Sequence, residues 1–187
     1  SNRNYFFHNN FEDENPVSSG ALNIWSRGNE GNYWIKYNFT GQDLNADGIG
    51  NDPYRIDENN LDYYPLMGAY SEHDITLGKL TYRISIISNS TISHVRFEVG
   101  KETGNKIINF EAAGKSDTTG FCRITIPVSL MGPPFTVADS VGVVSASLLS
   151  ISNETNSYLY FSFPNDNLTI SVIYSAELQL YNELMNK

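Results

Sequence analysis

Hydrophobic and polar residues alternate through most of the second half of the chain. From residue 80 to 86, Leu, Tyr and Ile occupy every second position, and Thr, Arg and Ser lie between them. A period of two places the apolar side chains on one face of an extended strand. Similar apolar runs follow at residues 95–99, 107–110, 121–126, 135–137, 141–149, 159–163 and 168–172. The pattern predicts seven or eight short β-strands.

Clusters of Gly, Pro, Asn, Asp and Ser separate these runs, as in Gly-Lys-Glu-Thr-Gly-Asn and Pro-Asn-Asp-Asn. Such residues end strands and form tight turns. Strands at this spacing over about 100 residues are typical of a two-sheet sandwich of immunoglobulin-like type. We therefore expect an immunoglobulin-like β-sandwich over residues 74–175, and a short helix or a tail over residues 176–187.

The part of the chain before the sandwich has a different character. Short apolar pieces lie among Asn, Gly and Asp, with no helical period over any useful window. Ten acidic and four basic residues give this part a net charge of -6, against -3 for residues 71–187. The change of pattern places a domain boundary between Met67 and Asp74, so that residues 1–70 form a domain of their own.

Composition narrows the class of protein. The net charge of -9 argues against a nucleic-acid binder, which needs a basic face, while 40% hydrophobic residues suffice for a folded core. The apolar runs are too short to cross a bilayer. The abundance of Asn, Tyr, Ser, Thr and Gly is typical of secreted β-proteins, and Asn-X-Ser/Thr glycosylation signals occur at Asn38, Asn89, Asn153 and Asn167. We expect an extracellular protein at the cell surface.

Little in the sequence indicates catalysis. Cys122 is the only cysteine and is expected to be a small buried core residue, so the chain forms no internal disulfide. The histidines, at His8, His73 and His94, are scattered singly, and structural or solvent-facing roles suit them best. No nucleophile and base, and no phosphate loop, can be argued from the spacing. We expect that the protein is not an enzyme.

The segment from Asp43 to Asp52 carries the clearest chemical pattern. Oxygen-bearing side chains recur at alternate positions, at Asp43, Asn45 and Asp47, and Gly48 then permits a sharp turn. This order is the first half of a calcium loop, in which Ile49 offers its backbone carbonyl. The sequence therefore predicts a calcium site.

The rest of the ligand set is less regular. The twelfth position, which is acidic in an EF-hand, is Tyr54, and no flanking helices are predicted, so this is not an EF-hand. Closure of the site must come from other oxygen-bearing side chains, for which the candidates are Asn51, Asp52, Asp57 and Asp62. A solvated turn rich in Asx residues, without a metal, is the alternative interpretation.

Several motifs between Asn4 and Met67 occur in a familiar order. Gly31-Asn32-Tyr33-Trp34 precedes the acidic loop, and Pro53-Tyr54-Arg55-Ile56-Asp57 and Asp62-Tyr63-Tyr64-Pro65-Leu66-Met67 follow it. The series resembles the C-terminal end of NosD-like right-handed parallel β-helix proteins, also called carbohydrate-binding and sugar-hydrolysis domains. The segments 4–11 and 23–25 resemble the last rungs of that repeat. Residues 75–175 look like the sandwich modules that follow such helices in archaeal surface proteins.

The resemblance implies an all-β chain: terminal coils and cap of a right-handed parallel β-helix, then the sandwich. It also implies Asn ladders at the corners of the coils, with the acidic loop sealing the end. Family members usually have Gly-Ile-Gly-Asp, whereas Asn51 replaces that Asp here. A solenoid needs about three coils to bury a continuous core, and one or two are expected here. Either the chain is a fragment of a longer protein or neighbouring subunits supply the missing coils.

These features favour a structural or adhesive module of a filament, sheath or surface layer. It would be stabilised by calcium and would assemble with itself or with other surface-protein chains through open strand edges. The alternative is a carbohydrate-binding module of a larger secreted protein, in which aromatic rings stack on sugars. The candidate rings are those of Trp25, Trp34 and Tyr63, with Tyr5 and Tyr64 as further faces. Exposure of these rings in a row would distinguish the two functions.

Overall fold

The computed structural model describes residues 3–13, 21–38 and 40–176. The protein is predominantly β, with 51% strand and 3% helix, so its all-β class is confirmed. The expected helix or tail at 176–187 lies, after Ala176, outside the described residues. The chain forms two compact units, Ser1–Ser71 with Ile87–Asn89 and Glu72–Ile86 with Ser90–Lys187. The division after Ser71 falls in the segment where the sequence pattern changes.

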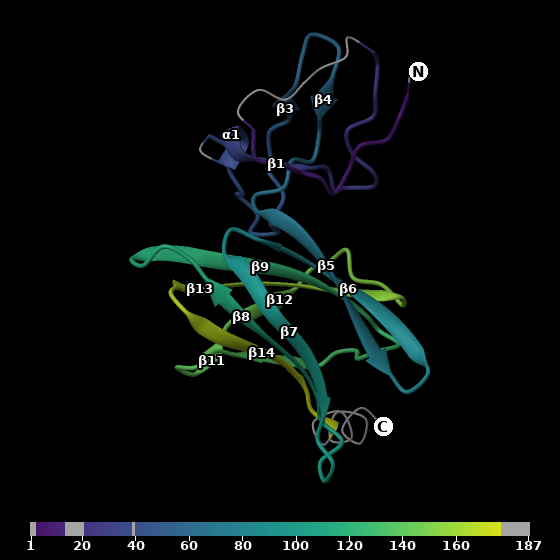
Figure 1. Ribbon diagram of the computed structural model, residues 1–187, viewed down its shortest axis with the longest axis vertical. Coiled ribbons are helices and arrows are strands. Elements are labelled where there is room, and N and C mark those ends of the chain that lie inside the picture. Colours follow the sequence, from purple (N-terminus) through teal and green to yellow (C-terminus); the bar gives the residue numbers. More distant parts are fainter. Residues whose placement is uncertain (1–2, 14–20, 39, 177–187) are drawn as a thin grey trace. The chain divides into compact units, whose positions relative to one another are not determined.

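The second unit contains two five-stranded sheets, most of whose strands are labelled in Figure 1. One sheet has the order β11-β10-β14-β8-β7, and the other has the order β12-β13-β9-β6-β5. The strands are β5 (Ala69–Leu77), β6 (Leu80–Ser88), β7 (Thr91–Val99), β8 (Lys106–Ala113), β9 (Thr118–Pro127), β10 (Phe135–Ala138), β11 (Val143–Val144), β12 (Ala146–Leu148), β13 (Asn156–Asn165) and β14 (Leu168–Tyr174). Strand pairs in both sheets are antiparallel, with Phe161 opposite Cys122 and Val172 opposite Ile108 as examples.

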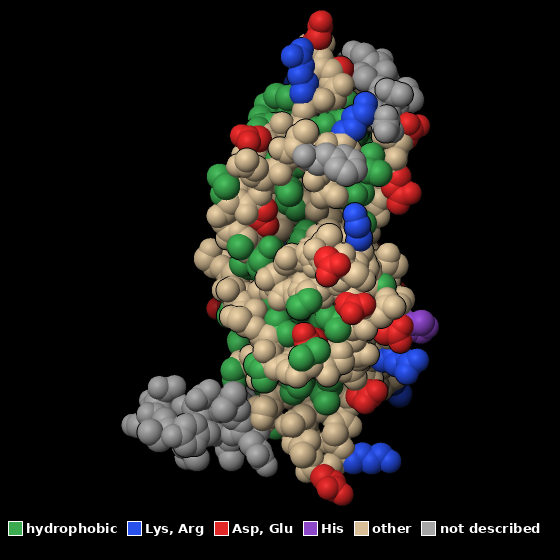
Figure 2. Space-filling model, turned by 90° about the vertical axis from the view of Figure 1, so that its left-hand side faces the viewer, with side chains coloured by type: hydrophobic (Ala, Val, Ile, Leu, Met, Phe, Trp, Pro, Cys, Tyr) green, Lys and Arg blue, Asp and Glu red, His purple; other side chains and the backbone are tan. Residues whose placement is uncertain are grey.

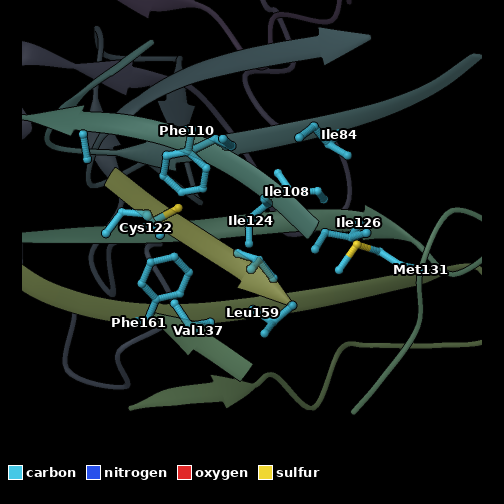
Figure 3. Packing of buried hydrophobic residues seen from close by; sticks show 14 of the residues in the cluster. Ile84, Ile108, Phe110, Cys122, Ile124, Ile126, Met131, Val137, Leu159 and Phe161 are labelled. Carbon is cyan, nitrogen blue, oxygen red and sulfur yellow. The ribbon is translucent and has the colours of Figure 1, made fainter. Parts of the chain in front are cut away.

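Alternation in the sequence explains the core of this unit. Ile108 and Phe110 of β8 point from one sheet toward Cys122 and Ile124 of β9 and Phe161 of β13 in the other, as Figure 3 shows. All five side chains are at most 2% exposed. Cys122 therefore lies in the core, as expected, and burial raises the pKa of its thiol.

The strand edges of the second unit differ from the sequence expectation in detail. The apolar run 141–149 divides into two very short strands, β11 and β12, with Val141 and Val143 largely exposed. The edge strand β7 has a register shift between Ser93 and Arg96, where His94 adopts a positive φ of 51°. Short strands and bulges both limit the pairing of an edge with another chain.

The first unit is a parallel stack of three chain segments. We call residues 3–11 the first rung, residues 22–34 the second rung and residues 60–67 the third rung. Parallel bridges join Tyr5 to Ile24 in the first two rungs and Tyr33 to Leu66 in the next two. The short elements are β1 (Asn10–Phe11), β2 (Tyr33–Trp34), α1 (Ile35–Asn38), β3 (Tyr54–Arg55) and β4 (Leu61–Asp62), and β1 pairs with β2 in parallel.

Aromatic rings fill the interior of the stack. Phe6 stacks on Trp25 with 4.7 Å between ring centroids, and Phe11 stacks on Trp34 at 4.2 Å. Tyr54 stacks on Trp34 from the other side at 4.7 Å. Equivalent positions in successive rungs therefore hold rings that contact one another. This repetition lets a unit with little regular strand bury a core of two tryptophans.

Candidate metal centre

The acidic loop of residues 43–52 lies between α1 and β3 in the first unit. The Asp43 carboxylate accepts backbone N–H bonds across the turn, from Asp47 at 3.0 Å on Oδ1 and from Gly48 at 2.8 Å on Oδ2. Gly48 has a φ of +81°, a conformation that L side chains rarely adopt, and Ala46 has a φ of +53°. The sharp turn expected at Gly48 is thus present.

Four of the candidate ligands come together in this loop. Asp47 accepts hydrogen bonds from the Ile49 N–H and from Asn45 Nδ2, both at 2.9 Å. Asn51 Oδ1 accepts the N–H of Leu44 at 2.6 Å, and Asn51 Nδ2 donates to Asn45 Oδ1 at 3.4 Å. Asp43, Asn45, Asp47 and Asn51 therefore turn toward a common loop interior.

The chemistry of this donor set suits a hard cation. Asp43 and Asp47 bring two carboxylates, and Asn45 and Asn51 add amide oxygens, which are the ligand types that Ca²⁺ prefers. An oxygen that accepts one N–H bond keeps a second lone pair for a cation. The described residues hold no group of three or more His, Cys, Asp or Glu side chains suited to a metal. A cation here would therefore depend on amide, carbonyl and water oxygens besides the two carboxylates.

Ile49 connects the loop to the stack of rungs. Gly50 N–H donates to the Pro65 carbonyl at 2.7 Å, and Met67 N–H donates to the Gly48 carbonyl at 3.0 Å. These bonds pair residues 48–50, which we call the closing segment, antiparallel to the third rung. The Ile49 N–H faces Asp47 instead. Because N–H and C=O of one extended residue point the same way, the Ile49 carbonyl also faces the loop, as a calcium ligand requires.

Tyr37 supports the loop through its backbone. The Tyr37 hydroxyl donates to the Asp52 carbonyl at 2.6 Å, and the Tyr37 ring is buried. A Cβ at Gly50 would lie 2.1 Å from that hydroxyl, and a Cβ at Gly41 would lie 2.2 Å from the ring. Burial raises the pKa of the Tyr37 phenol. Nearby carboxylate charges also raise this pKa, whereas the hydrogen bond to the Asp52 carbonyl lowers it. Tyr37 thereby fixes Asp52 at its carbonyl, while the Asp52 side chain stays exposed.

The two remaining candidate ligands have partners elsewhere. Asp57 accepts hydrogen bonds from Asn60 Nδ2 and from the Asn59 N–H. Asp62 is fully buried and accepts four bonds: from Asn32 N–H, Asn32 Nδ2, Trp34 Nε1 and the Tyr64 N–H. Burial raises the pKa of Asp62, although these hydrogen bonds oppose the shift. Both carboxylates are thus explained as acceptors within the stack of rungs.

Burial also changes the set of rings available to a sugar. Trp25 is 6% exposed and Trp34 is 1% exposed, because both lie inside the aromatic stack. Neither can present a ring face to a ligand, so the expectation for these two residues is corrected. Of the five candidate rings, those of Tyr5, Tyr63 and Tyr64 are accessible, at 60%, 58% and 38% exposed. A sugar platform would therefore have to use these tyrosines without either tryptophan.

The glycosylation signals differ in their surroundings. Asn153 and Thr155 are exposed, and Asn153 Oδ1 accepts both the N–H and the hydroxyl of Thr155, at 2.9 and 2.6 Å. Asn89 and Asn167 are also exposed. Asn38 is half-buried in α1, where its side chain hydrogen-bonds to Tyr33.

Sequence reasoning missed the residues that hold the stack together. Asn32 and Asn60 are buried, and each bonds to side chains in neighbouring rungs. His8, one of the three singly spaced histidines, contacts Glu30 at 2.7 Å and stacks on Tyr70. The high Asn content was the available signal, but it does not tell which Asn residues align, because the rungs differ in length.

Charged side chains lie scattered among hydrophobic and uncharged ones on the face seen in Figure 2. Among the described residues, no helix is long and apolar enough to cross a membrane. Comparison with known proteins finds no family model, no curated protein and no solved structure that matches this chain. The resemblance to NosD-like proteins therefore stays a prediction.

Proposed function

We propose that the first unit is the closing end of a parallel β-helix and that the second is an immunoglobulin-like sandwich. Together they form a calcium-stabilised structural or adhesive module of the extracellular surface, in a filament, sheath or surface layer. The module joins copies of itself or other surface-protein chains.

One observation carries this proposal: a segment of the chain pairs with one edge of the stack of rungs, and no described segment pairs with the other edge. The closing segment pairs with the third rung, so the acidic loop protects one edge. At the first rung, Asn4 and Phe6 bond to Ile24, which leaves the N–H and C=O of Tyr5 on the opposite side. Among the described residues no segment pairs with that side, and Tyr5 is 60% exposed. An open edge of this kind favours the addition of another strand.

The loop that forms the closed edge is the proposed calcium site. Asp43, Asn45, Asp47, Asn51 and the carbonyl of Ile49 would hold the ion, with water completing its coordination. The ion would neutralise the two carboxylates and order the turn. Order in the turn favours the pairing of residues 48–50 with the third rung, so metal binding and stability of the first unit are linked.

The experiment is the size of the protein in solution, by light scattering and negative-stain microscopy, first with calcium and then with excess chelator. We expect ordered assemblies that shrink on chelation, and Asp47→Ala should weaken calcium affinity and assembly together. Glu58→Ala, an exposed acid outside the loop, is the matched control and should change neither. A monomer under both conditions would overturn self-assembly, and assembly that persists after loss of calcium would break the link to the loop.

A further inference from the structure

Amide side chains connect the rungs by a bond pattern that repeats from layer to layer. The backbone N–H and the Nδ2 of Asn9 both donate to Asn32 Oδ1 in the second rung, at 3.2 and 2.8 Å. The backbone N–H and the Nδ2 of Asn32 both donate in turn to Asp62 Oδ2 in the third rung, at 2.7 and 3.1 Å. Each layer thus sends two donors to one side-chain oxygen of the next.

Neighbouring backbone groups fix the orientation of these amides. Asn32 Nδ2 also donates to the carbonyls of Phe6 and Trp25, which can only accept, and Asn32 Oδ1 faces the backbone N–H of Asn9, which can only donate. Asn9 Nδ2 is fixed in the same way by the carbonyl of Phe7 at 3.1 Å. Exchange of the oxygen and nitrogen atoms would break these bonds in both layers.

The ladder of Asn9, Asn32 and Asp62 therefore has a direction along the stack. Donors point from the first rung toward the third, and the last member is a carboxylate, which accepts without donating. A second ladder starts in the same direction, because the N–H and Nδ2 of Asn4 both donate to Asn23 Oδ1, at 3.3 and 3.1 Å. The closed edge ends in an acceptor that is fully satisfied, and the open edge presents acceptors.

Asn9 is the acceptor at the open edge. Its side chain is exposed, and both of its amide hydrogens are used, on Phe7 and Asn32. Its Oδ1 occupies the position in the first rung that Asn32 Oδ1 occupies in the second. Beside it, the backbone groups of Tyr5 and Asn10 face the same edge, because their neighbours bond to the second rung.

We propose that the open edge binds a parallel extended coil that carries an Asn directly over Asn9. The backbone N–H and side-chain amide of that Asn donate to Asn9 Oδ1, as Asn9 donates to Asn32. This inference rests on the proposed function and names the chemistry of the partner. An Asp at the same position would set a carboxylate against the acceptor, and a second copy's first rung facing this edge would set Oδ1 against Oδ1. The edge therefore selects a coil that offers amide donors and disfavours two first rungs that meet face to face.

A peptide with the sequence of residues 3–11 is the direct probe, because as a free strand it offers the same donors that the first rung offers to the second. The full chain, labelled with ¹⁵N and kept in calcium, is titrated with this peptide and followed by NMR at the amides of Tyr5 and Asn10. The matched control peptide carries Asn9→Asp and is otherwise identical.

We expect the Asn peptide to bind at least tenfold more tightly than the Asp peptide and to shift the Tyr5 and Asn10 resonances. Equal affinities would overturn the requirement for an Asn over Asn9. Strand addition at this edge, and with it the proposed function, would still stand. Binding by neither peptide would overturn the inference and remove the open edge from the proposed function. The dependence of assembly on calcium is measured separately by light scattering.

Discussion

Replacement of Asp62 by Ala tests whether the buried carboxylate holds the rungs of the first unit together. The change removes the only described acceptors of Asn32 N–H and Trp34 Nε1, which donate at 2.7 and 2.8 Å. Asn32 Nδ2 keeps the carbonyls of Phe6 and Trp25 as partners. A buried donor without a partner costs about 1–3 kcal/mol, so two of them should lower the free energy of unfolding by about 2–6 kcal/mol.

Asp62→Asn is the matched control. Its amide oxygen can take the place of Oδ2, which accepts three of the four bonds. Only the N–H of Tyr64, an exposed residue, loses its partner, and water can replace it. The loss of a buried charge offsets part of this cost, so we expect a change within about 1 kcal/mol.

The assay is urea unfolding followed by tryptophan fluorescence. The two tryptophans, Trp25 and Trp34, both lie in the first unit, so the signal reports that unit alone. Circular dichroism, to which the strands of the second unit contribute most, provides the internal control. An unchanged fluorescence midpoint in Asp62→Ala, or an equal loss of stability in both variants, would refute the reasoning.

Other contacts lead to three further predictions. Burial raises the pKa of Asp62 above the ordinary 3.8, so the native state binds the proton of this carboxyl more tightly than the unfolded state does. The stability that this proton contributes should fall as pH rises from 3.8 through the native pKa. Unfolding of Asp62→Asn, measured as a function of pH, should lack this fall. Gly50→Ala should lower the free energy of unfolding by about 1–3 kcal/mol in urea titrations, because the new Cβ meets the Tyr37 hydroxyl, and a wild-type midpoint would contradict the close packing. In a secretory host, mass spectrometry should find that Asn153→Gln removes a glycan and that Asn38→Gln does not; the reverse result would contradict the assignment from exposure.

The second unit is more predictable than the first, and its periodicity explains why. Alternation at Ile84, Ile86, Ile124 and Ile126 predicts strands with one buried face, and all four residues are in the core. Only local spacing is needed for that inference. The run 141–149 was less predictable, because its apolar side chains are mostly exposed on short edge strands, where burial does not enforce alternation.

The fold of the first unit is harder to predict, because it depends on contacts between residues far apart in the chain. The spacing between paired positions is uneven: Tyr5 pairs with Ile24, whereas Tyr33 pairs with Leu66, which lies much farther along the sequence. Unequal rungs hide the repeat that places Asn9, Asn32 and Asp62 in one ladder. The sequence pattern therefore indicated the acidic loop, whose members are close in the chain, but it also assigned Asp62 to the metal.

Calorimetric titration of calcium into the chelator-treated chain tests the central claim most directly, because the account requires the loop of residues 43–52 to bind the ion. We predict one saturable site per chain, a fluorescence-detected unfolding midpoint that rises with calcium, and loss of both effects in a variant carrying Asp43→Asn and Asp47→Asn. A flat titration of the wild-type chain, with unfolding midpoints that are identical in calcium and in chelator, would contradict the account.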